Sequence, residues 1–225
     1  MHIAILMANT DESAFAQAHP RDGEKFSGLL RGVRPAWQFS VFSVKDGEFP
    51  PEGAVFEGWL ITGSPASVND PQDWTLRLLG LIRQIVAAGQ PLFGACFGHQ
   101  AIAVALGGVV GENSGGWVFG ATDTVLEGEK IRLYAAHKEQ VLALPIGAVV
   151  IGGNDECPIG SFAIGRGVLT TQYHPEMTPE FMAALVAEYS RKLPKEIAER
   201  AKASLAVPAD TWAMAVRIVQ FFEGG

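Results

Sequence analysis

The stretch Pro91-Leu92-Phe93-Gly94-Ala95-Cys96-Phe97-Gly98-His99-Gln100 carries the strongest structural signal in the chain. It begins with apolar residues typical of a short buried strand, passes through Gly-x-Cys-x-Gly, and continues into helix-forming residues. This is the nucleophile-elbow pattern, with cysteine in place of serine. Such a turn holds the nucleophile in a strained backbone conformation, so the residues around it must be small, as Gly94 and Gly98 are.

The predicted elbow places the sulfur of Cys96 at the N-terminus of the following helix. Backbone N–H groups and the helix dipole favour a thiolate over a thiol at that position. Free cysteines are also common as small core residues, so Cys96 by itself leaves a structural role open. The only other cysteine is Cys157. A disulfide between the two is possible, but two cysteines in a chain without secretory features indicate free thiols.

Short apolar runs alternate with stretches of helical periodicity on both sides of the elbow. This alternation predicts an α/β fold with a doubly wound, mostly parallel sheet flanked by helices. We expect strands at residues 2–8, 37–44, 55–62, 91–95, 122–126, 131–135, 148–151, 161–164 and 168–172. We expect helices at residues 12–31, 74–86, 100–106, 137–141 and 181–193.

Residues 1–193 are predicted to form the catalytic domain, and residues 194–225 a helical extension packed on the same domain. In the extension, Trp212, Val216, Val219 and Phe222 follow Pro208 with the spacing of an amphipathic helix. We expect the apolar face of this helix to dock on the body of the domain. A partner-binding face is the alternative.

The composition is typical of a soluble globular chain, because 48% of the 225 residues are hydrophobic and 18% are charged. The formal net charge of −7 and the lack of a basic stripe disfavour a nucleic-acid partner. The first apolar run is too short for a signal peptide or a membrane span, so we expect a cytoplasmic protein. We expect no metal or organic cofactor, because the chain has neither metal-ligand spacing nor a glycine-rich phosphate loop.

A cysteine nucleophile usually needs a base, and His174 is the best candidate among the five histidines. It follows a predicted strand and begins the sequence His174-Pro175-Glu176. If the chain stays extended past Pro175, His174 and Glu176 project to the same side, and the carboxylate can orient the imidazole. The C-terminal ends of parallel strands share one edge of a sheet, so we expect His174 to meet Cys96 there. His-Pro-Glu alone would more simply be a surface turn.

Taken together, these motifs resemble the class I, or triad, glutamine amidotransferase family. The nucleophile segment of that family, Pro-x-x-Gly-x-Cys-x-Gly-x-Gln, is matched at every fixed position by residues 91–100, and its base segment by residues 172–176. Its oxyanion loop is similar to residues 62–65, and residues 115–120 resemble a Gly-Trp-x-x-Gly segment of stand-alone members. The resemblance covers roughly residues 1–190 and implies a flavodoxin-like architecture.

The resemblance implies a catalytic role for each matched position. Cys96 would be the nucleophile, His174 the general base and acid, and Glu176 the residue that orients the imidazole. The backbone N–H groups of Ser64 and Phe97 would form the oxyanion hole. Ser64 stands where the family more commonly has glycine, which a backbone donor tolerates.

The resemblance also implies residues that contact the substrate: Gly63, Gln100, Lys138 and Glu139. Trp117 would form a wall of the active-site mouth, although an aromatic residue that closes a turn is as good an interpretation. Ala136 stands where some relatives carry a polar residue. His99 is assigned to helix packing or to support of the site rather than to catalysis.

The implied reaction is cleavage of the γ-glutamyl amide of glutamine to glutamate and ammonia, through a γ-glutamyl thioester on Cys96. The length leaves no room for a fused synthetase domain. A separate ammonia-accepting synthase subunit would then use the ammonia, or the protein is a free-standing hydrolase of γ-glutamyl peptides or conjugates. A DJ-1-like cysteine hydrolase or chaperone would share the elbow but not His-Pro-Glu so far downstream. A non-catalytic regulatory relative normally loses a triad member.

Overall fold

The computed structural model describes residues 1–70 and 72–224. The strands are β1 (His2–Met7), β2 (Gln38–Ser43), β3 (Gly58–Ile61), β4 (Leu92–Ala95), β5 (Val109–Glu112), β6 (Val118–Leu126), β7 (Glu129–His137), β8 (Glu139–Ala143), β9 (Ala148–Gly153), β10 (Ser161–Ile164) and β11 (Val168–Thr171). The helices are α1 (Ala14–Gln17), α2 (Asp22–Val33), α3 (Asp73–Ala87), α4 (Phe97–Ala105), α5 (Pro179–Tyr189), α6 (Lys195–Ser204) and α7 (Thr211–Phe222).

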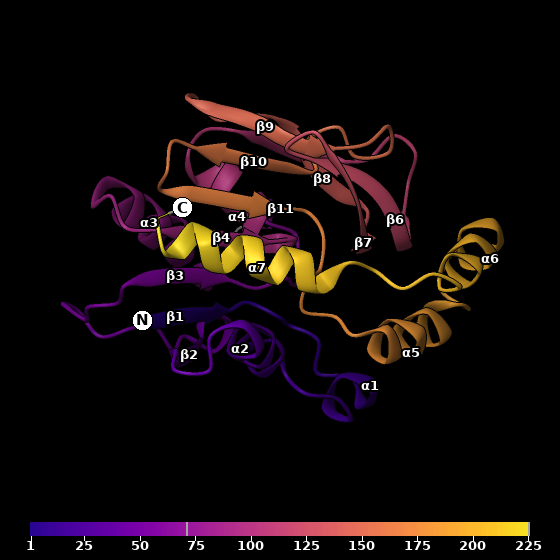
Figure 1. Ribbon diagram of the computed structural model, residues 1–225, viewed down its shortest axis with the longest axis horizontal. Helices are drawn as coiled ribbons and strands as arrows, with labels where there is room; N and C mark the ends of the chain where they lie inside the picture. The colour runs from indigo at the N-terminus through magenta and orange to yellow at the C-terminus, as the bar shows by residue number, and fades with distance from the viewer. Residues whose placement is uncertain (71, 225) are drawn as a thin grey trace.

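The main sheet has the strand order β2-β1-β3-β4-β11-β10-β9-β6-β7 (Figure 1). Five neighbouring strands run parallel to one another: β2, β1, β3, β4 and β11. Beyond β11 the sheet continues with β10, β9, β6 and β7, each of which is antiparallel to its neighbours. This mixed sheet, flanked by helices, confirms the predicted α/β fold. The C-terminal ends of β3, β4 and β11 share one edge, which is where open α/β sheets bind ligands.

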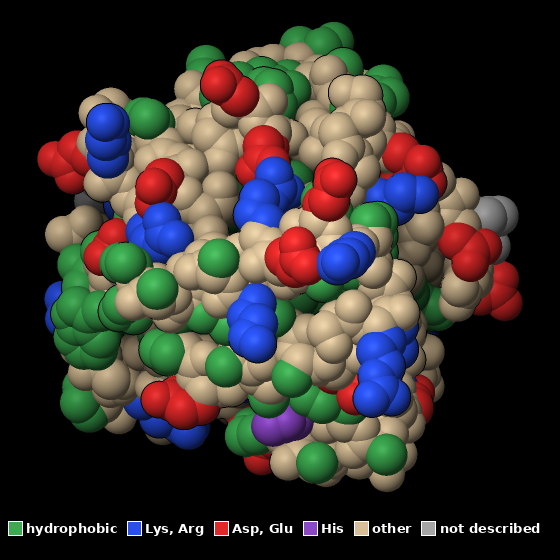
Figure 2. Space-filling model, turned by 90° about the vertical axis from the view of Figure 1, so that its right-hand side faces the viewer, with side chains coloured by type: hydrophobic (Ala, Val, Ile, Leu, Met, Phe, Trp, Pro, Cys, Tyr) green, Lys and Arg blue, Asp and Glu red, His purple; other side chains and the backbone are tan. Residues whose placement is uncertain are grey.

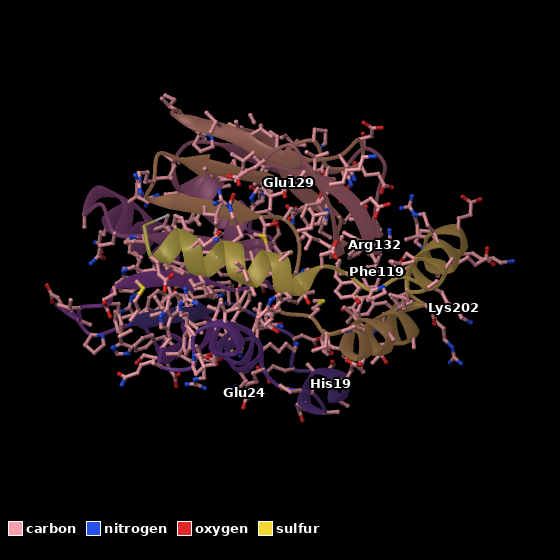
Figure 3. The ribbon with its side chains drawn as sticks, viewed as in Figure 1. His19, Glu24, Phe119, Glu129, Arg132 and Lys202 are labelled. Carbon is pink, nitrogen blue, oxygen red and sulfur yellow. The ribbon has the colours of Figure 1, made fainter. Side chains whose placement is uncertain are left out.

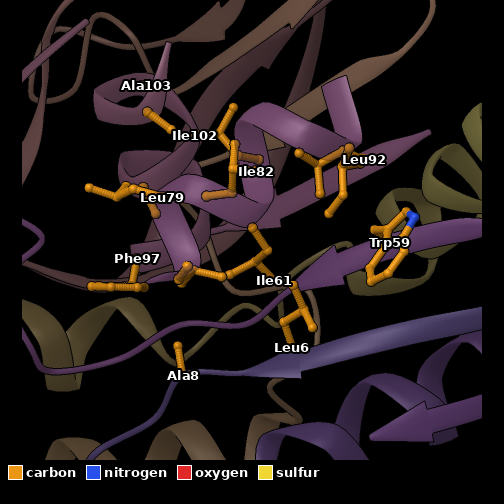
Figure 4. Packing of buried hydrophobic residues seen from close by; sticks show 14 of the residues in the cluster. Leu6, Ala8, Trp59, Ile61, Leu79, Ile82, Leu92, Phe97, Ile102 and Ala103 are labelled. Carbon is orange, nitrogen blue, oxygen red and sulfur yellow. The ribbon is translucent and has the colours of Figure 1, made fainter. Parts of the chain in front are cut away.

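Helices cover both faces of the parallel half, so its strands are apolar on both sides. Ile3 and Ile5 of β1 belong to the core cluster under α2 and α7. Leu6 points to the opposite face and packs in the cluster that contains Ile82 of α3 and Ile102 of α4 (Figure 4). The continuous apolar run at the start of the chain therefore contributes residues to the core layers on both faces of the sheet.

The helix α7 lies across the sheet in Figure 1, in contact with α2. Its buried face includes Met214, Ile218 and Phe222. Trp212, which the sequence predicted on the apolar face, is 57% exposed. It lies in the first turn of α7, where a Cβ atom on Gly32 of α2 would lie 3.1 Å from its ring.

The predicted helix at residues 12–31 is wrong in its continuity, because the chain forms two helices there, α1 and α2. Pro20 lies between them. Proline has no N–H to donate, and it disfavours the helical conformation of the residue before it. The short α1 buries no residue of its own, and α2 carries the buried Phe26 and Leu30.

The predicted helix at residues 137–141 is also wrong. His137 ends β7, and Glu139 begins β8, which pairs with β5 in a separate two-stranded sheet. Val141 lies opposite Val110 in this pairing. A partner strand from elsewhere in the chain therefore overrides the local helical preference of Lys, Glu and Gln.

Charged side chains of both signs are interspersed on the end of the molecule that carries α5 and α6 (Figure 2). Within residues 1–70 and 72–224, none of the helices has the length and apolar character to cross a membrane. The same residues contain no group of three or more His, Cys, Asp or Glu side chains placed to hold a metal ion. Cys96 and Cys157 are both free thiols.

The elbow between β4 and α4 passes very close to neighbouring backbone. A Cβ atom on Gly98 would lie 2.4 Å from the carbonyl oxygen of Ile61 in β3, and one on Gly94 would lie 2.6 Å from the carbonyl carbon of Gly98. Backbone atoms inside a sheet cannot move away cheaply. These two glycines therefore set how closely α4 approaches the sheet.

We expect Gly98→Ala to lower the free energy of unfolding by about 1–3 kcal/mol, because it forces atoms into a filled space. Gly80→Ala is the matched control, since Gly80 also lies in a helix but a Cβ there meets nothing within 4 Å. That variant should be stabilised by up to about 1 kcal/mol. Urea unfolding followed by circular dichroism measures both, and equal stability of the two variants would contradict the packing argument.

Candidate active site

Cys96 occupies the turn between β4 and α4 with φ 48° and ψ −105°. A positive φ is uncommon for a residue other than glycine, and it costs on the order of 1–3 kcal/mol. The Cys96 N–H donates to the Thr171 carbonyl of β11 at 2.8 Å, and the Cys96 carbonyl accepts from the Gln100 N–H of α4 at 3.1 Å. Hydrogen bonds from two elements thus hold the strained turn, as the elbow pattern predicted.

His174 lies three residues beyond the end of β11, where its N–H donates to the Tyr134 carbonyl of β7 at 2.9 Å. Its Nδ1 is 2.7 Å from Oε1 of Glu176, and both side chains are buried. The pairing does not come from an extended strand, which was the expectation from the sequence. The chain turns after His174, with the Met177 N–H donating back to the His174 carbonyl at 3.5 Å.

The loop after β3 brings Gly63 against the side chains of both Cys96 and His174. A Cβ atom on Gly63 would lie 2.8 Å from Cε1 of His174 and 3.5 Å from Cβ of Cys96. Residue 63 must therefore be glycine for the imidazole to lie beside the cysteine. Because Glu176 occupies Nδ1, the free ring nitrogen of His174 is Nε2.

The protonation of His174 reflects opposing influences. Burial alone lowers the pKa of His174, but the negative charges of Glu176 and of the Cys96 thiolate, with hydrogen bonds to both, raise this pKa well above its usual value. The arrangement therefore favours an imidazolium cation paired with anionic neighbours. Such an imidazolium can give its proton to a leaving group.

Two backbone N–H groups near Cys96, those of Ser64 and Phe97, have no hydrogen-bond partner among the described residues. Phe97 directly follows the cysteine and begins α4. The loop of Ser64 is fixed to the end of β1, because the Ala8 N–H donates to Oγ1 of Thr62 at 3.0 Å. Its own Oγ accepts from the Ala66 N–H at 3.1 Å. Rigid, unpaired donors of this kind suit an oxyanion hole.

Gln172 is a further residue in contact with Cys96, and it was not predicted to have a role of its own. Its Nε2 donates to Sγ of Cys96 at 3.5 Å, and its Oε1 accepts from Nε2 of Gln100 at 3.2 Å. The place of Gln172, directly after a buried strand and two residues before His174, was the signal available in the sequence. Gln100 thus lies behind Cys96 and orients Gln172.

The other predicted substrate-contacting residues lie apart from the cysteine and the histidine. Lys138 forms an ion pair with Glu112 at 2.6 Å, and Glu139 accepts from Oγ of Ser67 at 3.0 Å. Neither of them, nor Gln100, lines the cleft in front of Cys96. Their contact with substrate stays a prediction.

Two buried histidines accompany the site without entering the cleft. The His99 Nδ1 is 2.8 Å from Oγ1 of Thr170, and the ring packs on Phe162. Burial, and then the charge of His137, lower the pKa of His99 to about 3. Burial and the charge of His174 lower the pKa of His137 to about 4. Both rings are therefore neutral at neutral pH, and the packing of His99 agrees with the supporting role assigned to it.

A cleft of about 280 Å³ opens in front of Cys96 and His174. Gly63 and Ser64 form its edge beside the cysteine, and Trp117 forms part of its wall. The cleft is also lined by Phe119 of β6, by three residues of α5 and by residues of the segment that contains α1. Phe119 and His19, two of these lining residues, are labelled in Figure 3. The aromatic residues of this lining come from distant segments and were not predicted as site residues, apart from Trp117.

Comparison with known proteins gives a consistent result. The glutamine amidotransferase class-I family model matches residues 41–188. Gamma-glutamyl peptidase 2 of Arabidopsis thaliana is 30% identical over 75% of this chain and 74% of its own length. A glutamine amidotransferase-like protein of Schizosaccharomyces pombe is 29% identical over 98% of both chains.

A solved structure shares the fold across nearly the whole chain. The glutamine amidotransferase from Methylobacillus flagellatus superposes with a TM-score of 0.73 at 23% identity, covering 99% of this chain and 94% of its own. The family model itself spans well over half of the residues. The chain therefore belongs to the class I glutamine amidotransferase family.

Proposed function

We propose that the protein is a cysteine-dependent hydrolase of γ-glutamyl amide bonds, with Cys96, His174 and Glu176 as its catalytic triad. The observation that carries this proposal is the arrangement of the three side chains. Cys96 lies on a strained elbow, and His174 lies beside it against Gly63. Oε1 of Glu176 lies 2.7 Å from Nδ1 of His174.

In the proposed mechanism, the Cys96 thiolate attacks the γ-carbonyl carbon and the carbonyl π electrons move to its oxygen. The N–H groups of Ser64 and Phe97 stabilise that oxyanion, each by on the order of 3 kcal/mol. His174 donates its proton to the nitrogen, the carbon–nitrogen bond breaks, and a neutral amine or ammonia leaves. His174 then takes a proton from water, whose oxygen attacks the thioester carbon. The carbon–sulfur bond breaks, which releases glutamate and restores the Cys96 thiolate.

Two leaving groups fit this chemistry. Glutamine would release ammonia, which a separate synthase subunit would consume, and family membership supports that candidate. A γ-glutamyl peptide would release an amino acid or peptide. The similarity to a protein named gamma-glutamyl peptidase over three quarters of both chains and the extent of the cleft favour the second candidate.

We expect Cys96→Ala to lower kcat/KM for γ-glutamyl dipeptides by on the order of 10⁴-fold or more, because the variant cannot form the thioester. Wild-type protein mixed rapidly with substrate and quenched in acid should gain the mass of one γ-glutamyl group on the peptide that contains Cys96. Coupled detection of released glutamate gives the rate, and mass spectrometry gives the adduct.

The matched control for this experiment is Cys157→Ala. Burial raises the pKa of the Cys157 thiol to about 12, so this second cysteine stays protonated and unreactive. The control should retain wild-type turnover and the same adduct. If Cys96→Ala hydrolysed the dipeptides as fast as the wild type, the proposed function would be refuted.

We expect Glu176→Gln to reduce kcat by on the order of 10³-fold and to change the pH profile. The titratable groups that face His174 are Glu176, Cys96 and His137, and the ring of His137 is neutral at neutral and alkaline pH because its pKa is about 4. The substitution removes the carboxylate charge that helps to raise the pKa of His174, so the imidazolium loses its proton at a lower pH. The alkaline limb of kcat/KM, which reports loss of that proton, should therefore move to lower pH.

A series of initial rates from pH 5 to pH 10 on both proteins measures this shift, with thermal unfolding to verify that the variant is folded. An alkaline limb at the same pH in both proteins would show that Glu176 does not control the protonation of His174.

A further inference from the structure

The cleft in front of Cys96 extends far beyond the reacting groups. We propose that this extension binds the leaving group, and that the preferred substrates are γ-glutamyl amides whose nitrogen carries an aromatic or other bulky apolar group. This inference rests on the proposed function and names the substrate class of the same site.

The position of His174 decides which end of the substrate the extension receives. The leaving nitrogen must come within hydrogen-bond distance of the imidazole that protonates it. Nδ1 is engaged with Glu176 at 2.7 Å, so Nε2 performs this transfer. A substituent on the nitrogen therefore starts beside His174, and Met177, three residues further along the chain, lines the cleft at that point. Ala136, which also lines it, leaves the path open because its side chain is small.

One wall of the extension is a single face of α5. Phe181, Leu185 and Tyr189 follow one another at intervals of four residues, so their side chains lie above one another on the helix. All three line the cleft. Because α5 begins five residues after His174, this wall starts immediately beside the base.

Aromatic side chains from β6 and from the residue before it continue this wall. The ring centroids of Trp117 and Phe119 are 6.1 Å apart, and those of Phe119 and Tyr189 are 5.5 Å apart with an angle of 31° between the planes. Phe119 is labelled in Figure 3, in the region between β6 and the two helices α5 and α6. A row of rings thus reaches from the mouth of the cleft to α5. Such surfaces bind flat apolar groups well.

The segment around α1 forms another side of the extension. The Phe15 and Phe181 rings are 5.9 Å apart, and the His19 ring meets Phe181 edge-on at 5.1 Å. Lys25, which also lines the cleft, is paired with Asp22 at 3.0 Å and lies over the Phe181 ring at 3.5 Å. This cation is therefore already neutralised within the wall, and it adds to the packing around the ring.

The size of the cleft also favours a large leaving group. Ammonia is close to a water molecule in size and needs about 30 Å³. The cleft offers about 280 Å³. The glutamyl group takes part of this space, and ammonia or a glycine is too small to fill the part that the aromatic rings line.

The test compares kcat/KM of the full-length protein for γ-glutamyl-L-phenylalanine and γ-glutamyl-glycine, with released glutamate as the readout. We expect the phenylalanine substrate to be favoured by about tenfold or more, the range that apolar pockets achieve. The pair γ-glutamyl-phenethylamide and γ-glutamyl-ethylamide repeats the comparison without the carboxylate of the amino acid, and it should show the same preference.

The variants Trp117→Ala and Phe181→Ala should each reduce the ratio of the two kcat/KM values by about fivefold or more. Trp212→Ala is the matched control, because this tryptophan is 57% exposed and lies outside the lining of the cleft. It should leave the ratio at its wild-type value. Thermal unfolding of each variant verifies its fold.

The outcomes separate this inference from the proposed function. If wild-type protein cleaves all four substrates at similar kcat/KM, in a reaction that Cys96→Ala abolishes, the leaving-group site is wrong and the γ-glutamyl hydrolase stands. If a preference exists but Trp117→Ala and Phe181→Ala leave it unchanged, the site is likewise wrong. If none of the four substrates is cleaved, the proposed function fails and the inference fails with it.

Discussion

The contact between Gly98 and the Ile61 carbonyl, where no Cβ atom can fit, determines where the sulfur of Cys96 lies. It lets the start of α4 lie directly on β3, and the turn that precedes α4 is consequently bent into the positive φ of Cys96. The same approach brings Cys96 beside the loop that follows β3, which supplies Gly63 and the Ser64 N–H. The positions of Cys96, Gly63 and the Ser64 N–H therefore depend on one close packing of backbone on backbone.

The second half of the site depends on contacts between segments far apart in the chain. His174 reaches the cysteine because its N–H is bound to the Tyr134 carbonyl of β7 and because a glycine at position 63 admits its ring. Glu176 reaches the imidazole through a turn. The charges of Glu176 and Cys96 then overcome the effect of burial on the imidazole, so the low polarity of the interior strengthens the pairing instead of neutralising it.

The sequence was most informative where local pattern and tertiary structure agree. The apolar runs predicted the parallel strands, and Gly94 and Gly98 on either side of Cys96 predicted the elbow because a tight turn requires small residues there. Prediction failed at residues 137–141, where the helix-favouring Lys138, Glu139 and Gln140 lie in or next to a strand whose partner is β5. The prediction of a continuous helix over residues 12–31 did not take account of Pro20. The aromatic lining of the cleft was not predicted as a set, because these residues are far apart in the sequence and their positions do not indicate that they pack together.

The neighbouring strands β4 and β11 are separated in the chain by residues 96–167, and this order has a consequence for biosynthesis. A ribosome delivers β4 long before β11, so one edge of β4 has no strand to pair with while the intervening residues emerge. The Cys96 N–H finds its acceptor on Thr171 only once β11 arrives. Cys96 therefore stays apart from His174 in the nascent polypeptide, and the two residues can meet only after β11, which His174 follows, has been translated.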